Sequence, residues 1–231
     1  MKFKNKLEEI LIDIFSVIGT LLVIVPLFIG AEIGVIRKPV MYEYPWLYNP
    51  CLVLFYGSFY NRRKNVFMWE IRPSKNDRIL ELGCGDGSNC GEMEFKEYIG
   101  VDRSGSMLIK NVPKNAKLVK ACASDFNADG KFDKIIMRDL LHHVGRDNKV
   151  LLNAVRHSKK GTRIYIWDAY VMKSRLKPVA RHVLRVFDGE CGEWFQMEEF
   201  REYLNNVEGT RLVKFECYPK RNIMAVLEVD A

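Results

Sequence analysis

The sequence predicts an α/β domain with a Rossmann-like, mostly parallel sheet of seven strands and helices on both faces, preceded by a transmembrane helix. Two observations lead to this fold class. Between residues 78 and 167, short apolar runs typical of buried parallel strands alternate with helical segments. Ahead of that domain, residues 14–31 form an uncharged, mostly apolar run about as long as a helix needs to cross a bilayer.

The apolar run predicts a membrane anchor over residues 1–38. Asp13 and Glu32 bracket it, and Pro26 inside it is better tolerated in membrane helices than in soluble ones. A cleaved signal peptide would have a shorter apolar stretch, and a fully buried helix of a soluble protein is the other alternative. Basic residues flank both ends, so charge does not settle on which side the N-terminus lies.

Residues 39–60 are crowded with Tyr, Trp and Phe, which prefer the headgroup level of a membrane. We interpret them as an interfacial segment. The alternative is a short second span over residues 44–60, which would make the anchor a hairpin instead of a single pass, but this stretch contains Asn49 and two prolines. The six cysteines include no C-x-x-C pair, which is typical of reduced thiols in a domain that faces the cytoplasm.

The third region, residues 61–231, holds the α/β domain. A helix over residues 62–71 is expected to end before Pro73. The apolar runs predict strands at residues 78–82, 98–101, 117–120, 132–137, 163–167, 211–217 and 222–229. Helical patterns cover residues 104–111, 145–157, 173–187 and 197–204, and a short helix follows the glycine loop at residues 88–95. The last two strands are expected to form an antiparallel pair.

The sharpest chemical signal is the run Glu81-Leu-Gly83-Cys84-Gly85-Asp-Gly87 at the end of the first predicted strand. Glycines are needed where the backbone turns sharply and approaches a ligand with no Cβ in the way. The spacing is G-x-G-x-G, not the G-x-G-x-x-G of dinucleotide sites. The carboxylate before the loop suits a ligand with a cationic amine.

A second signal follows about 20 residues later, where Asp102 ends the second predicted strand. A carboxylate at that place can accept hydrogen bonds from both ribose hydroxyls of an adenosine. An acidic turn residue would be the simpler explanation for Asp102 alone. Together with the glycine loop, it predicts an adenosine-containing ligand.

These motifs, with Ala123-Ser-Asp125-Phe126, residues 132–143 and residues 160–168, resemble the class I S-adenosylmethionine (SAM)-dependent methyltransferases over about two-thirds of the chain. Within that superfamily the chain is most similar to the ubiquinone- and menaquinone-biosynthesis type. The resemblance implies SAM as the cofactor and implies cofactor contacts from Glu81, Gly83, Cys84, Gly85, Gly87, Asp102, Arg103, Asp125, Phe126, Arg138 and Asp139.

The resemblance also implies a role for each group of residues. The three glycines would line the methionine part of SAM, with Glu81 supporting its ammonium. Asp102 would hold the ribose, and Asp125 with Phe126 would lie at the adenine. Arg138 and Asp139 would border the methionine moiety. The helix after the glycine loop is short, which should leave one side of the pocket less enclosed.

A carbon or phenol acceptor needs a base, and His142 and His143 follow the fourth predicted strand at the sheet edge where ligands bind in such folds. We take them as the catalytic candidates, although a histidine in such a loop often only packs there. Asp168 and Tyr170 are weaker candidates for orienting substrate. The basic, amphipathic residues 173–187 predict a membrane-facing lid, with residues 192–195 bordering the substrate opening.

The sequence argues against a metal site. His142 and His143 have no nearby cysteine partner, and the calcium-like run that begins at Asp125 has Ile136 where a bidentate glutamate is required. The net charge of +7 would suit nucleic acid or anionic lipid, but residues 61–65 are the only dense basic stretch.

We therefore expect a membrane-anchored methyltransferase whose partners are the lipid bilayer and a lipophilic small molecule: a quinone precursor, an isoprenoid or a phospholipid. Nucleic acid is disfavoured because Met137-Arg-Asp-Leu140 stands where a methyltransferase of base amino groups has an Asn/Asp-Pro-Pro-Tyr motif. A tethered methyltransferase of protein or RNA and a non-catalytic SAM-binding scaffold remain the alternatives.

Overall fold

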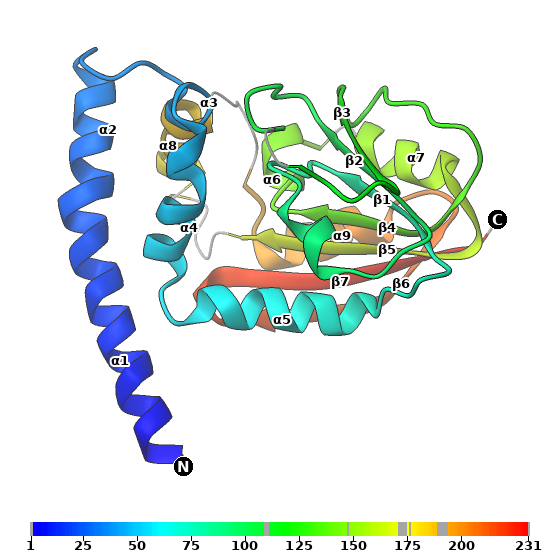
Figure 1. Ribbon diagram of the computed structural model, residues 1–231, viewed down its shortest axis with the longest axis horizontal. Coiled ribbons are helices and arrows are strands. Elements are labelled where there is room, and N and C mark those ends of the chain that lie inside the picture. Colours follow the sequence, from blue (N-terminus) through cyan, green and yellow to red (C-terminus); the bar gives the residue numbers. More distant parts are fainter. Residues whose placement is uncertain are drawn as a thin grey trace.

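A computed structural model of the chain describes residues 2–108, 111–146, 148–170, 175, 177–188 and 194–230. Its sheet has the strand order β3-β2-β1-β4-β5-β7-β6 (Figure 1). The strands are β1 (Arg78–Leu82), β2 (Glu97–Asp102), β3 (Ala116–Lys120), β4 (Phe132–Arg138), β5 (Ser158–Ala169), β6 (Thr210–Tyr218) and β7 (Asn222–Val229). The α-helices are α1 (Lys2–Gly19), α2 (Val25–Glu32), α3 (Val40–Glu43), α4 (Tyr48–Tyr56), α5 (Phe59–Ile71), α6 (Leu141–Val144), α7 (Lys149–Arg156), α8 (Lys177–Asp188) and α9 (Met197–Asn205).

The predicted Rossmann-like, mostly parallel sheet of seven strands with helices on both faces is confirmed. Strands β1 to β5 pair in parallel, and β7 pairs antiparallel with both β5 and β6. The chain fills one half of the sheet with β1, β2 and β3 and then crosses back to place β4 on the other side of β1. The strand order therefore switches direction between β1 and β4, and the carboxyl ends of these strands leave a crevice there.

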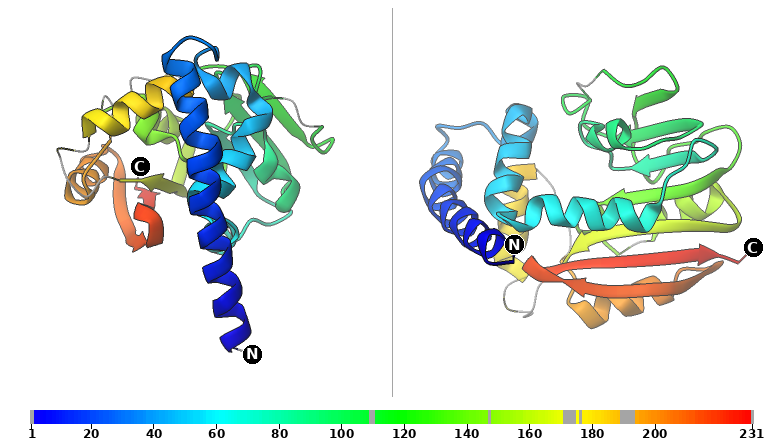
Figure 2. Two further views of the ribbon diagram at one scale, coloured as in Figure 1. Left: turned by 90° about the vertical axis from the view of Figure 1, so that its left-hand side faces the viewer. Right: turned by 60° about the horizontal axis from the view of Figure 1, so that its bottom comes forward.

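Both faces of the sheet are buried, which explains why its central strands are apolar at successive positions. Ile79 and Ile136 point to the face that α5 covers, whereas their neighbours Leu80 and Ile135 point to the face that α7 and α9 cover. Figure 2 shows α5 running along one side of the sheet. The two resulting cores fix the strands whose ends carry the site.

The N-terminal rod, as we call residues 2–32, consists of α1, the π-helical turn Thr20–Ile24 and α2. In the π turn the Val25 N–H bonds to the Thr20 carbonyl, which accommodates Pro26, a residue with no N–H to donate. The segment Ile10–Glu32 has a mean hydropathy of 2.6 and is long and apolar enough to cross a membrane. Large apolar side chains are exposed along it at Ile10, Leu11, Ile12, Ile14, Phe15, Val17, Ile18, Leu21, Leu22, Val23, Val25 and Ile29.

A third apolar cluster joins this rod to the sheet domain. We call it the N-terminal helical cluster; its buried members are Ile24, Ala31, Val40, Met41, Cys51, Val186 and Phe187. It brings together α2, α3, α4 and α8, and the Phe28 ring stacks on Phe187 at 6.3 Å between centroids. The aromatic segment predicted at residues 39–60 thus forms α3, a 3-10 turn (Pro45–Leu47) and α4 between the rod and the sheet domain.

Two predicted helices differ from the structure. The helix expected at residues 104–111 is wrong over its described residues, because Asp102 accepts the Ser104 N–H at 2.9 Å and residues 105–107 form a turn. The helix expected at residues 145–157 begins later, at Lys149, because Gly145 (φ +82°) ends the separate helix α6 and Asn148 (φ +56°) precedes α7. The glycine loop is followed by only a 3-10 turn (Ser88–Glu92), as the short helix predicted there suggested.

Three further boundaries moved outward. Helix α5 begins three residues before the predicted helix, and β5 is a 12-residue strand that extends the prediction at both ends. Helix α8 (Lys177–Asp188) ends one residue beyond the predicted basic helix, and residues 173, 174 and 176 of that prediction lie outside the described residues.

Substituting Phe67 should test the core between α5 and the sheet. Phe67 is completely buried against Trp167, so Phe67→Ala should lower the free energy of unfolding by about 3–5 kcal/mol. In the same helix Trp69 is 64% exposed, and Trp69→Ala should cost less than about 1 kcal/mol. Urea unfolding of the full chain in detergent measures both; equal losses would contradict this packing.

Candidate functional site

The glycine loop after β1 is bent by three glycines with positive φ: Gly83 (+73°), Gly85 (+55°) and Gly87 (+74°). L-residues with a side chain rarely adopt such angles. At Gly83 a Cβ would also lie 2.8 Å from the Leu140 side chain. The loop therefore keeps bare backbone facing the space beyond the sheet, as the sequence predicted.

Asp102, at the end of β2, ties this loop to the sheet. Its carboxylate accepts the Gly85 N–H at 2.8 Å and the Ser104 N–H at 2.9 Å. The Gly83 and Cys84 N–H groups both donate to the Val101 carbonyl. Partial burial raises the pKa of Asp102, although these backbone donors oppose the shift. The ends of β1 and β2 thus form one rigid unit.

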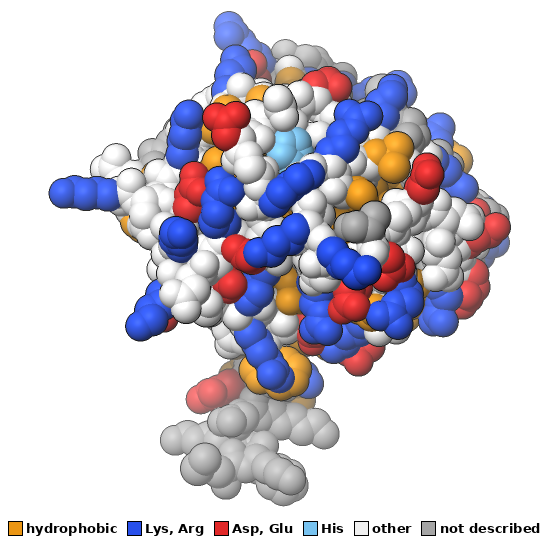
Figure 3. All heavy atoms as spheres, turned by 90° about the vertical axis from the view of Figure 1, so that its right-hand side faces the viewer, with side chains coloured by type: hydrophobic (Ala, Val, Ile, Leu, Met, Phe, Trp, Pro, Cys, Tyr) orange, Lys and Arg blue, Asp and Glu red, His pale blue; other side chains and the backbone are white. Residues whose placement is uncertain are grey.

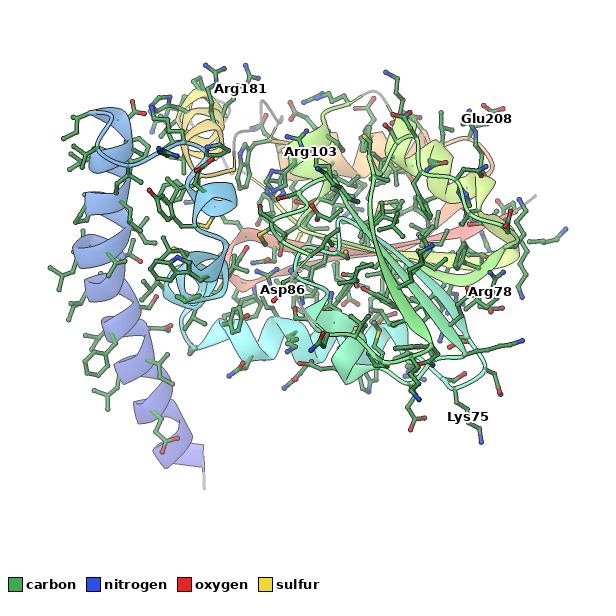
Figure 4. All side chains as sticks on the ribbon, turned by 45° about the horizontal axis from the view of Figure 1, so that its top comes forward. Lys75, Arg78, Asp86, Arg103, Arg181 and Glu208 are labelled. Atoms are coloured by element: carbon green, nitrogen blue, oxygen red, sulfur yellow. The ribbon has the colours of Figure 1, made fainter. Side chains whose placement is uncertain are left out.

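A cavity opens at the carboxyl ends of β1 to β4, at the switch point of the sheet. The residues around it are Met41, Gly83, Gly85, Val101, Asp102, Arg103, Met107, Cys122, Ala123, Arg138, Asp139, Leu140, His143 and Val144. In Figure 4, Arg103 marks this edge of the sheet on the side of α8, and Lys75 and Arg78 mark the opposite edge.

The structure brings together about half of the site residues expected from the sequence. Those that line the cavity are Gly83, Gly85, Asp102, Arg103, Arg138, Asp139 and His143. Those that do not line it are Glu81, Cys84, Gly87, Asp125, Phe126 and His142. The first group forms the candidate cofactor site, and the second group needs separate explanations.

Glu81 is only 1% exposed and both its oxygens are engaged within the protein. It accepts hydrogen bonds from Asn89 and from the Tyr98 hydroxyl, each at 2.5 Å. Burial raises the pKa of the Glu81 carboxyl, and the charge of Arg138 opposes that shift. Through these two hydrogen bonds Glu81 of β1 is joined to Tyr98 of β2 and to Asn89 in the turn after the glycine loop. Glu81 therefore stabilises the loop from within the protein.

Two other predicted contacts lie away from the cavity. Asp125 and Phe126 line a separate hollow with Asn153 and His157, where the Phe126 ring stacks on His157 at 6.0 Å. Cys84 is buried, which raises the pKa of its thiol, and its side chain packs toward Gly100. At the end of β3 it is Cys122 and Ala123, just ahead of Asp125, that reach the cavity.

Arg138 and Asp139 place opposite charges side by side on the cavity wall. Within the described residues the side chain of the half-buried Arg138 makes no hydrogen bond or ion pair, although its charge acts on the Glu81 carboxyl. Asp139 adopts φ +54°, and its buried Oδ1 has no hydrogen-bond partner. Its other oxygen forms an ion pair with Arg63 of α5, whose guanidinium lies 4.0 Å from the centre of the Tyr56 ring. The buried pair holds one carboxylate oxygen of Asp139 and leaves the second buried without a partner, in a residue that lines the cavity.

The two histidines have different environments. His143 lines the cavity, and its Nδ1 is buried without a hydrogen-bond partner. Burial, with smaller contributions from His142 and Arg103, holds the pKa of His143 well below its usual value. His142 lies behind it, with Nδ1 2.5 Å from an oxygen of Asp168 and its ring 4.7 Å from that of Trp194. Asp168 also accepts the Leu141 N–H at 2.7 Å, so it fixes the turn that carries both rings.

Sequence reasoning missed the apolar wall of the cavity, which includes Met41, Met107, Leu140 and Val144. Leu140 and Val144 could have been found because they flank the two candidate histidines. Met41 lies in α3, about 40 residues before the glycine loop, and no sequence pattern connects it to the site. Among the described residues, no group of three His, Cys, Asp or Glu side chains could hold a metal ion.

A family model described as a methyltransferase domain matches residues 73–208, which is more than half of the chain. That match covers every strand from β1 to β5 and all the residues around the cavity except Met41. No curated protein sequence matches the chain.

Solved structures resemble the chain in fold. The YcgJ protein of Bacillus subtilis has 14% identity and a TM-score of 0.60 over 74% of this chain and 99% of its own. A putative SAM-dependent methyltransferase of Listeria monocytogenes has 13% identity and a TM-score of 0.56, over 73% and 98%. Magnesium protoporphyrin IX methyltransferase of Synechocystis, solved with S-adenosylhomocysteine (written SAH), has 15% identity and a TM-score of 0.53, over 74% and 82%.

Two aspartates give a matched test of where the cofactor binds. Asp102→Ala removes a cavity carboxylate and the anchor of the glycine loop, and should weaken SAM binding at least about tenfold. Asp125→Ala alters the separate hollow and should change the affinity less than about twofold. Isothermal titration with SAH measures both, and a larger loss for Asp125→Ala would place the adenosine elsewhere.

The Arg63–Asp139 pair should behave as a coupled unit. Arg63→Met alone leaves the Asp139 carboxylate buried without its cation and should lower the free energy of unfolding by about 3–5 kcal/mol. Adding Asp139→Asn removes that charge and keeps a residue that tolerates positive φ, so the double variant should recover most of the loss. Additive losses in urea unfolding would show that the pair is not coupled.

Proposed function

This chain belongs to the family of methyltransferase domains, and from that premise we propose a membrane-associated enzyme that methylates a lipophilic small molecule. SAM-dependent methyl transfer is the reaction class of the family and SAM is the methyl donor. The membrane association and the class of acceptor are the proposal. One observation supports it above the others: Met41, which belongs to the N-terminal helical cluster, also forms part of the cavity wall.

The cavity suits the two ends of SAM. Its methionine end is a zwitterion, and Arg138 and Asp139 offer an unpaired guanidinium and an unpartnered carboxylate oxygen side by side. Asp102 offers a carboxylate to the ribose hydroxyls, and Gly83 and Gly85 leave space that a side chain would fill. These residues would hold SAM without help from Glu81, whose oxygens are already bonded.

The remaining wall suits an apolar acceptor. Met41, Leu140 and Val144 contribute apolar side chains, and α3, which carries Met41, packs on α8 and follows the apolar rod. A molecule that stays in a membrane would reach the cavity along these helices without crossing water. A quinone precursor, an isoprenoid or a phospholipid fits this description.

When bound, SAM supplies an electrophilic methyl group on a sulfonium, so the protein mainly has to align the acceptor and remove a proton from it. His143 lies at the cavity wall with a lowered pKa, so it is neutral at physiological pH and can take that proton. Asp168 holds His142, and His142 packs against His143 at 4.1 Å between ring centres. We assign His143 as the base and His142 with Asp168 as its support.

The acceptor class can be tested with labelled SAM and a total membrane lipid extract. We expect label in a lipid fraction with the full chain and none with Asp102→Ala. Label in protein or RNA and in no lipid would contradict the proposal and favour a tethered macromolecule methyltransferase. SAM binding without transfer to any of these would instead favour a non-catalytic SAM-binding scaffold.

The pH dependence tests the assignment of His143. A base whose pKa is held well below 6.5 loses activity only when the pH falls below that lowered value, so kcat/KM should stay flat between pH 8 and about 6.5. His143→Ala should lower kcat by about 100-fold or more with little change in SAM affinity. A wild-type profile that titrates near pH 6.5 and disappears in His143→Ala would contradict the environment described for His143.

A further inference from the structure

We propose that the N-terminal rod lies in the plane of the membrane, with its outer apolar stripe in the lipid and the basic helix α8 at the headgroups of anionic lipids. This inference rests on the proposed membrane association, but not on the identity of the acceptor. It differs from the sequence prediction, in which the same helix crosses the bilayer.

The rod has two distinct sides. A covered stripe runs through Ser16, Ile24 and Ala31, at helical spacing. On the opposite side Phe15, Leu22 and Ile29 recur every seven residues and are 68%, 71% and 52% exposed. An apolar stripe of this length on the outside of a folded domain marks a surface that binds something apolar. Its length and its lack of charge between Ile14 and Ala31 fit a lipid surface.

The covered stripe is held by polar contacts at both of its ends. Near the start, the Asp13 carboxylate accepts the Ser58 N–H at 3.1 Å and the Ser58 hydroxyl at 3.0 Å. Near the end, Glu32 pairs with His182 of α8 at 3.2 Å and with Lys38. Asp13 and Glu32 are 19 residues apart, which is about 28 Å of helix and close to the thickness of a bilayer core.

A spanning orientation would therefore carry the attached helices into the hydrocarbon. Figures 1 and 2 show α2 beside α8 and the later part of α1 beside α4, whereas the N-terminal part of α1 extends beyond the rest of the molecule. Helix α8 exposes Arg181 and Arg185, and charged side chains at bilayer depth are costly. Lying in the plane, the rod places only its outer stripe in lipid and keeps those arginines at the polar surface.

The charge distribution supports the same orientation. Arg175, Arg181 and Arg185 lie exposed on or next to α8, which packs on α2. On the far side of the molecule, Lys and Arg side chains are interspersed with Asp and Glu (Figure 3). The arginines near the rod meet the negative surface of an anionic leaflet, and the far side faces water.

Depth measurements on the full chain decide between the two orientations. Single added cysteines at Phe15, Leu22 and Ile29, in a background with Cys122→Ser, Cys191→Ser and Cys217→Ser, carry a spin label into vesicles of phosphatidylcholine with a minority of phosphatidylglycerol. A rod that lies in the plane of the membrane predicts equal, shallow depths of the spin label in the bilayer at all three positions. A spanning rod would place Leu22 about 10 Å deeper than the other two, and that result would overturn the inference while leaving the membrane association intact.

Accessibility gives a second readout. Cysteines at Glu8 and Arg37 should both react with a membrane-impermeant maleimide added outside the vesicles, whereas reaction of only one of them would indicate a span and overturn the inference. Charge reversal at Arg181 (Arg181→Glu) should weaken binding to the anionic vesicles about tenfold and leave binding to pure phosphatidylcholine unchanged. The matched control Lys75→Glu, at the opposite edge of the sheet, should change neither (Figure 4). If the wild-type chain binds no vesicle, both this inference and the proposed membrane association are wrong.

Discussion

A buried guanidinium–carboxylate pair, Arg63 with Asp139, connects the N-terminal helices to the wall of the cavity. Asp139 follows the strand β4 in a left-handed conformation, lines the cavity and has one buried oxygen without a partner. Arg63 reaches it from α5 and lies against the ring of Tyr56 in α4. Ser58, the residue just before α5, donates two hydrogen bonds to Asp13 of the rod. A continuous set of contacts therefore runs from the apolar rod to the cavity.

The topology of the sheet explains why the cavity lies where it does. The chain adds β2 and β3 on one side of β1 and then places β4 on the other side. The glycine loop after β1 and the Arg138–Asp139 turn after β4 therefore face each other across the crevice at this switch point. Methyltransferases and other enzymes with this fold can differ in the elements that cover the crevice. Here α3 contributes part of that cover, which joins a general cofactor site to a chain-specific apolar wall.

The sequence was informative where a signal is local. The alternating apolar runs predicted the seven strands, and the glycine loop with Asp102 predicted half of the cavity, because turn geometry and strand ends depend on neighbouring residues. The environment of Glu81 could not be predicted, since Asn89 and Tyr98 bond to it only after the loop has folded back. Arg63 is 76 residues from Asp139, and Met41 belongs to another cluster, so tertiary packing alone brings them to the site. The prediction of a helix after Asp102 was wrong because the Asp102 carboxylate accepts a hydrogen bond from the Ser104 N–H, which favours a turn.

Hydrogen exchange of the full chain in detergent, with and without SAH, tests whether the cofactor lies at the switch point under a wall that includes α3. We expect slower exchange with SAH at residues 83–87, 101–104 and 138–144 together with the helix Val40–Glu43. Protection confined to residues 124–130, with none at the glycine loop or in α3, would contradict this placement of the cofactor.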